Sequence, residues 1–199
     1  LMKAYYAKQD AEKLSGKGDT SQKLTLMKTS ADSLKKSADA LNDSSLWEKK
    51  KIKKKDEKTG EEIEVEDYDW DKITKAVKSF VEDYNDVVKE AGESNTKDVL
   101  RNASWMTGMT DKNSNMLAQI GITIGKGNKL ELDEDALKQA DISSLKTVFT
   151  GYNSFVSKIS QKATGISNAA NRASATYTNN GTYSKTDSYL TSSKIDKEV

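Results

Sequence analysis

The feature that most constrains this chain is a regular spacing of apolar residues that keeps them on one face of a helix. Between Thr20 and Ser44 these residues are separated by alternating steps of three and four: Leu24, Met27, Ala31, Leu34, Ala38 and Leu41. Such a spacing places a continuous apolar stripe along one side of an α-helix. We therefore predict a helix over residues 20–44, which Asp19, Thr20 or Ser21 can cap at its N-terminus.

Two further segments carry the same helical pattern. One stripe runs from Ile73 to Ala91 and predicts a helix over residues 70–91, with Gly92 as its stop. Another runs from Leu145 to Ala173, with Gly151 as a candidate break between a short helix and a long one. The chain contains no proline, so no proline ring kinks these helices.

The segment between Asn95 and Gln119 is helical in pattern but less regular. Its apolar residues are more widely scattered, and it contains Gly108 and a polar run over residues 110–115. Glycine inside a helix costs about 1 kcal/mol relative to alanine. We therefore expect the helix to be interrupted there.

Two short segments have the pattern of β-hairpins. In the first, a basic arm and an acidic arm flank a loop that ends at Gly60. Pairing Asp56 with Glu61 places these residues opposite each other: Ile52 and Val65, Lys53 and Glu64, Lys51 and Glu66, Trp47 and Trp70. Opposite charges then face each other along the ladder. The second hairpin covers residues 120–132, with a Gly-Lys-Gly-Asn turn.

Together these elements predict a mainly α protein. We expect an elongated antiparallel helical bundle or coiled coil, with small β-hairpins at its ends at about residues 47–68 and 120–132. Residues 20–175 then form the helical bundle domain, with the hairpin 47–68 as an insertion, between an N-terminal arm (1–19) and a polar C-terminal tail (176–199). The expected helix-packing core is Leu34, Leu41, Ile73, Val77, Phe80, Tyr84, Val88, Phe149, Tyr152, Phe155, Val156 and Ile159.

Composition excludes several classes of function. The chain has no histidine and no cysteine, which rules out Ser-His-Asp and Cys-His catalysis within it, as well as zinc–thiolate sites. Its 32 basic and 31 acidic residues balance, which argues against nucleic-acid binding by overall charge. No apolar run approaches the roughly 20 residues of a membrane span. We predict no catalytic residue, metal, cofactor, nucleic acid, membrane span or small-molecule substrate.

Three weak motifs have simpler structural explanations. The segment Gly121–Lys126 lacks the spacing of a phosphate loop and is better explained as a hairpin turn. The triplet Asp133–Asp135 lacks calcium-loop spacing and suits a helix N-terminus. The carboxylates of Glu62, Glu64 and Glu66 suggest acid–base chemistry, but they lie on a charged hairpin with nothing apolar to raise a pKa. We therefore predict that the protein is not an enzyme.

Both ends of the chain have too few apolar residues to fold alone. Isolated apolar groups on polar segments can instead dock on a neighbouring molecule, which makes the ends candidate assembly arms. The alternative is that the tail lies along its own bundle or frays. The arm residues are Leu1, Tyr5, Tyr6, Tyr177, Tyr183 and Tyr189.

The middle and end of the chain, about residues 70–175, carry several blocks in a characteristic order. These blocks are residues 73–85 (ITKAVKSFVEDYN), 98–101 (DVLR), 117–122 (LAQIGI) and 127–137 (GNKLELDEDAL), followed by Leu145 and Val148-Phe149. Their order and spacing resemble the C-terminal part of the flagellar hook-associated protein 2 family, the filament cap. The short hairpin that replaces the family's large β-rich head domains indicates a reduced or divergent member.

The resemblance implies an extracellular structural protein. Family members pass unfolded through the flagellar export channel, assemble as rings at the filament tip and help flagellin subunits fold into place. We therefore expect an extracellular subunit at the bacterial flagellum or cell surface that assembles, through its helices, with itself or with other flagellar or surface subunits. The alternative is an intracellular, cytoplasmic coiled-coil adaptor that binds a partner helix.

Overall fold

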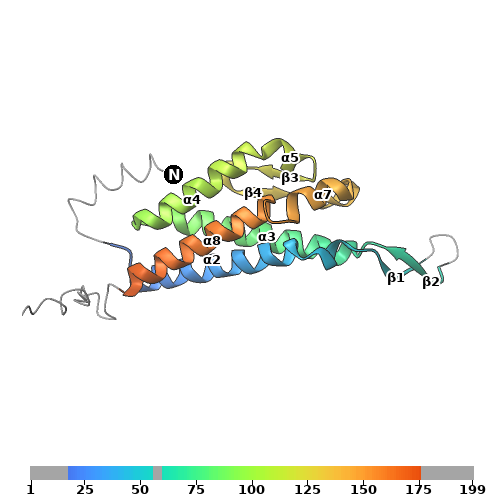
Figure 1. Cartoon of the computed structure of the whole chain (residues 1–199), viewed down its shortest axis with the longest axis horizontal. Coiled ribbons are helices and arrows are strands. Elements are labelled where there is room, and N and C mark those ends of the chain that lie inside the picture. Colours follow the sequence, from blue (N-terminus) through green and yellow to red (C-terminus); the bar gives the residue numbers. More distant parts are fainter. Residues whose placement is uncertain (1–17, 56–59, 176–199) are drawn as a thin grey trace, which may run out of the picture.

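Four long helices lie side by side in the computed structural model, which describes residues 18–55 and 60–175 (Figure 1). They are α2 (Ser21–Asn42), α3 (Trp70–Gly92), α4 (Lys97–Lys112) and α8 (Phe155–Ala175). Helix α2 packs against α3 and α8, and α4 also packs against α3 and α8. Helices α2 and α8 run antiparallel, as two hydrogen bonds between them show. Helices α4 and α8 do so too, because Asp98 lies near Arg172 and Trp105 near Lys162. The expected mainly helical protein with two small hairpins is confirmed.

Shorter elements connect the long helices. They are the 3₁₀-helix η1 (Ser44–Trp47), β1 (Lys50–Lys55), β2 (Glu62–Asp67), α5 (Ser114–Ala118), β3 (Ile122–Ile124), the 3₁₀-helix η2 (Lys126–Asn128), β4 (Leu130–Leu132), α6 (Glu134–Gln139) and α7 (Ile142–Phe149). Local sequence explains where several long and short helices begin. Thr20 and Asp69 accept a backbone N–H at the N-termini of α2 and α3, and Asp133 and Asp141 do so at those of α6 and α7.

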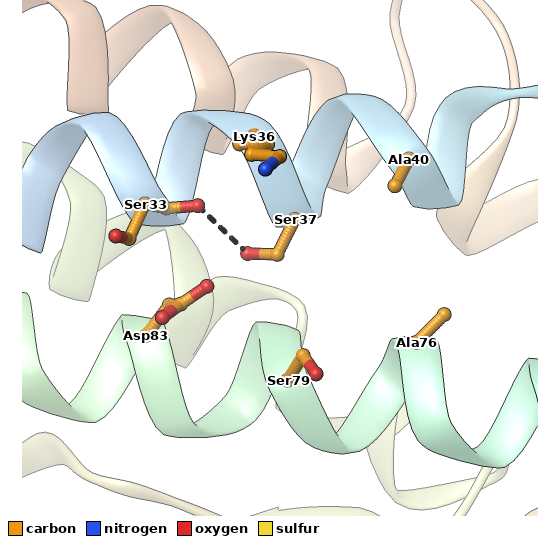
Figure 2. A pocket seen from close by; sticks show the side chains of 7 residues that line it. All are labelled: Ser33, Lys36, Ser37, Ala40, Ala76, Ser79 and Asp83. Atoms are coloured by element: carbon orange, nitrogen blue, oxygen red, sulfur yellow. Dashed lines mark hydrogen bonds between the residues drawn. The ribbon is translucent and has the colours of Figure 1, made fainter.

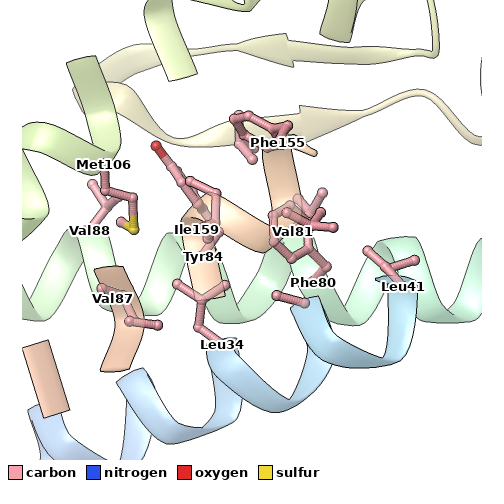
Figure 3. Close-up of a cluster of buried hydrophobic side chains, with 14 of the residues drawn as sticks. Leu34, Leu41, Phe80, Val81, Tyr84, Val87, Val88, Met106, Phe155 and Ile159 are labelled. Carbon is pink, nitrogen blue, oxygen red and sulfur yellow. The ribbon is translucent and has the colours of Figure 1, made fainter. Parts of the chain in front are cut away.

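The apolar stripes meet in one core at the centre of the bundle (Figure 3). The edge of the Phe155 ring meets Phe80 at a centroid distance of 6.3 Å, and Tyr84 lies next to Phe80 on α3. The hydroxyl of Tyr84 donates to Thr110 of α4 at 2.9 Å, and burial raises the pKa of Tyr84 to about 12. Of the expected core residues, the following are buried: Leu34, Leu41, Ile73, Val77, Phe80, Tyr84, Val88, Phe149, Phe155, Val156 and Ile159.

Tyr152 is the expected core residue that lies outside the core. Its side chain is 83% exposed, because the third stripe is broken where Gly151 adopts a left-handed conformation with φ of +98°. Helix α7 ends at Phe149 and α8 begins at Phe155, so Tyr152 falls in the turn between them. The prediction for Tyr152 is wrong, while Gly151 is indeed a break.

Helix α4 runs through Gly108 to Lys112, so the expected interruption at Gly108 is wrong. The expected break in the polar run over residues 110–115 is found, because α4 ends and α5 begins within it. A Cβ at Gly108 would meet no atom within 4 Å, so this glycine is not needed for close packing. Ala103, Met106 and Thr110 are buried on the same helix. Their packing outweighs the cost of about 1 kcal/mol of one glycine in a helix, and the helix ends at Asn113 instead.

The first hairpin has the expected register but is shorter than expected. Ile52 pairs with Val65, Lys53 with Glu64, and Lys51 with Glu66. The expected Trp47–Trp70 pair is wrong, because the ladder begins at Lys50. Trp47 is instead buried in η1, where its ring stacks on Phe149 at 5.3 Å and its indole N–H donates to the Leu41 carbonyl at 2.8 Å.

The second hairpin lies against the side of the bundle rather than at its end. The side-chain amide of Asn85 on α3 donates to the carbonyl of Leu130, and its oxygen accepts from the Leu130 N–H. Gly121 has φ of +79°, and a Cβ there would lie 2.7 Å from the Asp133 carbonyl oxygen. Glycine is therefore required where the chain turns into β3.

Candidate assembly surfaces

The two ends of the described chain lie at the same end of the bundle (Figure 1). Residue Gly18 precedes α2 and Ala175 closes α8. Because α2 and α8 are antiparallel, the start of one lies beside the end of the other. The segments 1–17 and 176–199 therefore both continue from this end, which we name the chain-end pole.

At the chain-end pole, a buried carboxylate links two segments by hydrogen bonds. The Asp19 side chain is 1% exposed and accepts hydrogen bonds from the Ser94 hydroxyl (2.8 Å), the Asn95 N–H (2.9 Å) and the Thr96 hydroxyl (2.7 Å). The Lys23 ammonium lies 3.5 Å away. Burial alone would raise the pKa of Asp19, but these hydrogen bonds and the Lys23 charge together hold it below the ordinary value. Asp19 thus joins the start of α2 to the α3–α4 turn.

A polar ladder with a seven-residue repeat runs along the seam between α2 and α8. The Ser167 hydroxyl donates to Asp32 at 2.6 Å, and the Ser160 hydroxyl donates to Asp39 at 2.7 Å. Lys28 and Lys35, each one helical turn earlier, pair with the same two carboxylates. Burial alone would raise the pKa values of Asp32 and Asp39, but the lysine and serine contacts together hold both below the ordinary value. The ladder fixes the register of α8 on α2.

Removing the serines of this ladder should destabilise the bundle modestly. We expect Ser160→Ala combined with Ser167→Ala to lower the free energy of unfolding by about 1 kcal/mol per hydrogen bond, because both acceptors are ionised yet half exposed. Urea denaturation followed by circular dichroism measures this loss. Ser79→Ala, on the exposed face of α3, is the control for the higher helix propensity of alanine. The stability change of the double variant is compared with that expected from the Ser79→Ala effect alone. If the two agree, the serine hydrogen bonds contribute nothing to stability.

A groove of about 290 Å³ lies between α2 and α3 on the outside of the bundle (Figure 2). Its lining is mostly small side chains: Ser33, Ser37, Ala40, Ala76 and Ser79, with Lys36 and Asp83. Burial raises the pKa of Asp83 above its ordinary value, and the neighbouring acids Asp86 and Glu82 add to this, while a hydrogen bond with Ser37 opposes it. The groove is open to solvent and is not an enclosed ligand pocket.

Large apolar side chains are exposed at separate places on the bundle. Trp105 of α4 is 45% exposed, and the Lys162 ammonium from α8 lies 4.3 Å from its ring centroid. Such a cation–π contact covers one face of the indole. Leu26 on α2 and Tyr152 in the α7–α8 turn are also exposed. Because these side chains stand on different elements, they do not by themselves define one docking site.

The residues expected to act as assembly arms lie outside the described part of the chain. They are Leu1, Tyr5, Tyr6, Tyr177, Tyr183 and Tyr189. Within residues 18–55 and 60–175, no group of three or more His, Cys, Asp or Glu is placed to hold a metal ion. No helix in this part of the chain has the length and apolar character needed to cross a membrane. The expected absence of metals, cofactors and substrates stays a prediction.

Two polar features were not predicted from the sequence, although each has a local signal. Thr96 precedes α4 without capping it by its side chain, because its hydroxyl donates to Asp19. Of the three candidate caps for α2, it is Thr20, not Asp19, whose side chain accepts a backbone N–H at the start of the helix. The seven-residue repeats of Asp32 with Asp39 and of Ser160 with Ser167 are visible in the sequence, but their pairing depends on which helices become neighbours.

Comparison with known families gives one match. Residues 94–198, more than half of the chain, match a family model described as the flagellar hook-associated protein 2 C-terminus. The match begins at Ser94, in the turn held by Asp19, and continues from α4 through α8 into the polar tail. It therefore begins later and ends later than the residues 70–175 that carry the resemblance seen in the sequence. No curated protein and no solved structure gave a match.

Proposed function

The chain belongs to the flagellar hook-associated protein 2 family, and from this premise we propose that it is an extracellular structural subunit of the bacterial flagellum. It works by helix-mediated assembly with itself or with other flagellar or surface subunits. The observation that carries the proposal is the family match over residues 94–198.

The geometry of the chain-end pole supports assembly through the ends of the chain. Segments 1–17 and 176–199 continue from neighbouring points, because α2 and α8 are antiparallel. Two segments that start side by side can present their apolar residues to the same neighbour. We place the subunit contacts on these two segments, with Tyr5, Tyr6, Tyr177, Tyr183 and Tyr189 as their anchors.

Hydrogen bonds within the helical bundle hold the starting points of the two arms in place. Asp19 ties the start of α2 to the α3–α4 turn, and the Asp–Ser ladder ties α8 to α2. The points where the two arms begin are therefore held in a fixed relation to each other. Ordering an arm on a neighbour costs less entropy when its anchor point is already fixed.

Trimming the chain to residues 18–175 should separate assembly from folding. We expect the trimmed protein to keep the helix content per residue and the melting temperature of the full chain, because the described core lies within this range. It should lose any concentration-dependent assembly. Sedimentation velocity over a range of concentrations, combined with circular dichroism, measures both properties.

The matched control is a full-length chain in which Tyr177, Tyr183 and Tyr189 are replaced by serine. It keeps the length and polarity of the tail and should also fail to assemble. Identical monomers before and after trimming, or a trimmed body that unfolds, would contradict the arm hypothesis. Recovery of the protein only from cytosol, and not from sheared filaments or culture supernatant, would favour the adaptor alternative.

A further inference from the structure

Neither edge of the β1–β2 hairpin is paired with a third strand among the described residues. It follows η1 and precedes α3, so it projects beyond the helices at the end opposite the chain-end pole (Figure 1). Among the described residues, its sheet consists of these two strands alone. Each strand therefore has one side along which backbone N–H and C=O groups have no partner strand, and such an edge is a template for pairing with another chain.

The two edges carry opposite charge. Strand β1 has the sequence KKIKKK and strand β2 has the sequence EIEVED. Lys51 and Lys53 lie on the same face of the sheet as Glu64 and Glu66, because these residues are paired in the ladder and side chains alternate along a strand. A basic edge and an acidic edge thus lie on opposite sides of one narrow ribbon.

The other face of the hairpin is mixed, with apolar residues beside charged ones such as the paired Lys50 and Asp67. Ile52 pairs with Val65, and both are half-buried, while Ile63 on the same face is 41% exposed. An isolated two-stranded hairpin is marginally stable in water. A further strand on either edge would extend the charged face, where lysines recur at every second position of β1 and glutamates at every second position of β2. It would also lie beside the apolar residues of the other face.

We propose that this hairpin pairs edge to edge with the hairpin of a second copy of the chain, β1 of one copy against β2 of the next. The two strands pair antiparallel, with the lysine–glutamate faces of both copies on the same side of the joined sheet. In this register lysines of one copy lie opposite glutamates of the next, and Ile52 lies opposite Ile63 or Val65. Pairing β1 with β1, or β2 with β2, would instead place like charges directly opposite each other, which is unfavourable. The contact is therefore head-to-tail, and such contacts repeat to give rings or open chains.

The proposal deepens the assembly function and rests on it, because it names a second surface and its partner. A simpler explanation of β1 is that edge lysines discourage pairing altogether. That explanation does not extend to the edge of β2, which carries acidic and β-branched residues and no lysine. An acidic edge discourages a second acidic edge but attracts a basic one.

Cross-linking between two differently marked full-length chains tests the contact. The chain contains no cysteine, so introduced thiols are the only ones present. One chain carries Lys53→Cys, and the other carries a size tag with Glu62→Cys, Glu64→Cys or Glu66→Cys, so that register shifts of two residues are covered. A short thiol-to-thiol cross-linker is added, and products are resolved by size under denaturing conditions. We expect cross-linked dimers of mixed size in the mixture, and only background dimers from either chain alone.

The matched control is a mixture of Lys75→Cys and tagged Lys112→Cys chains, whose thiols stand at exposed positions on α3 and α4. The mixed product of the hairpin chains should exceed this control and should fall as salt shortens the Debye length from about 10 Å at 0.1 M to about 3 Å at 1 M. Mixed products no more abundant than this control, or than like-with-like products, would overturn the proposal. If sedimentation still shows assembly in that case, the terminal-arm function stands and the hairpin contact alone is wrong. If sedimentation shows a monomer at every concentration, both are wrong.

Discussion

Replacing Phe80 with alanine is expected to lower the free energy of unfolding by about 3–5 kcal/mol, the range observed when a buried phenylalanine is truncated. The Phe80 side chain is fully buried. Its ring contacts Tyr84 on its own helix and Phe155 across the core, each at a centroid distance of 6.3 Å. Alanine would leave a cavity between α3 and α8 that the surrounding helices fill only in part. Urea denaturation monitored by circular dichroism measures the change.

Tyr152→Ala provides the matched aromatic control for Phe80. Tyr152 is 83% exposed, so its loss should change the free energy of unfolding by no more than about 0.5 kcal/mol. Similar losses for both variants would mean that Phe80 is not part of the core, or that the α7–α8 turn carries more stability than its exposure indicates. Helix content before denaturation should be the same in both variants.

Asp19→Ala is expected to cost about 3 kcal/mol at neutral pH. The substitution removes the acceptor for the Ser94 and Thr96 hydroxyls and for the Asn95 N–H. Ser94 is itself buried, and buried donors without partners cost about 1–3 kcal/mol each. Asp19→Asn keeps one acceptor oxygen without the charge, and it should therefore lie between the wild type and Asp19→Ala in stability.

The effect of Asp19 should depend on pH in a defined direction. In the folded protein the pKa of Asp19 is held below its ordinary value, because hydrogen bonds and the Lys23 charge together outweigh the effect of burial. Ionised Asp19 therefore stabilises the fold fully at pH values above the pKa that Asp19 has in the unfolded chain. This stabilisation is lost as pH falls through the lower pKa that Asp19 has in the folded protein. We expect the difference in unfolding free energy between wild type and Asp19→Ala to be constant from pH 7 to about pH 5 and to shrink below about pH 4. A difference that stays constant into strong acid would show that the carboxylate charge contributes nothing.

The helices were predictable because their apolar period reports directly which side is buried. The stripe Leu24 to Leu41 predicted α2, and the stripe that starts at Ile73 predicted α3. The register of the first hairpin was predictable for a similar reason, because its loop and its matched charges permit few pairings. These features depend on residues that are close in sequence.

The features that were missed depend on contacts between residues far apart in sequence. Gly108 appeared to interrupt a helix, but packing by Met106 and Thr110 overrides its low propensity. Trp47 was assigned to a strand because nothing nearby in the sequence indicates that Phe149 will stack on it. Asp19 finds its hydrogen-bond donors in a turn at the far end of α3. Such contacts become visible only once the helices have been placed beside each other.

The common position of the two ends of the bundle has a mechanical consequence. A force that separates Gly18 from Ala175 acts across the seam between α2 and α8, and it breaks the Asp32–Ser167 pair before the Asp39–Ser160 pair. The helices are then peeled apart one contact after another, which requires less force than breaking all contacts together. A force between the chain-end pole and the hairpin runs along the helices instead and loads their contacts in shear. The protein should therefore resist tension along its length much better than tension between its two ends, and a neighbour that grips both ends at once would protect it from being unzipped.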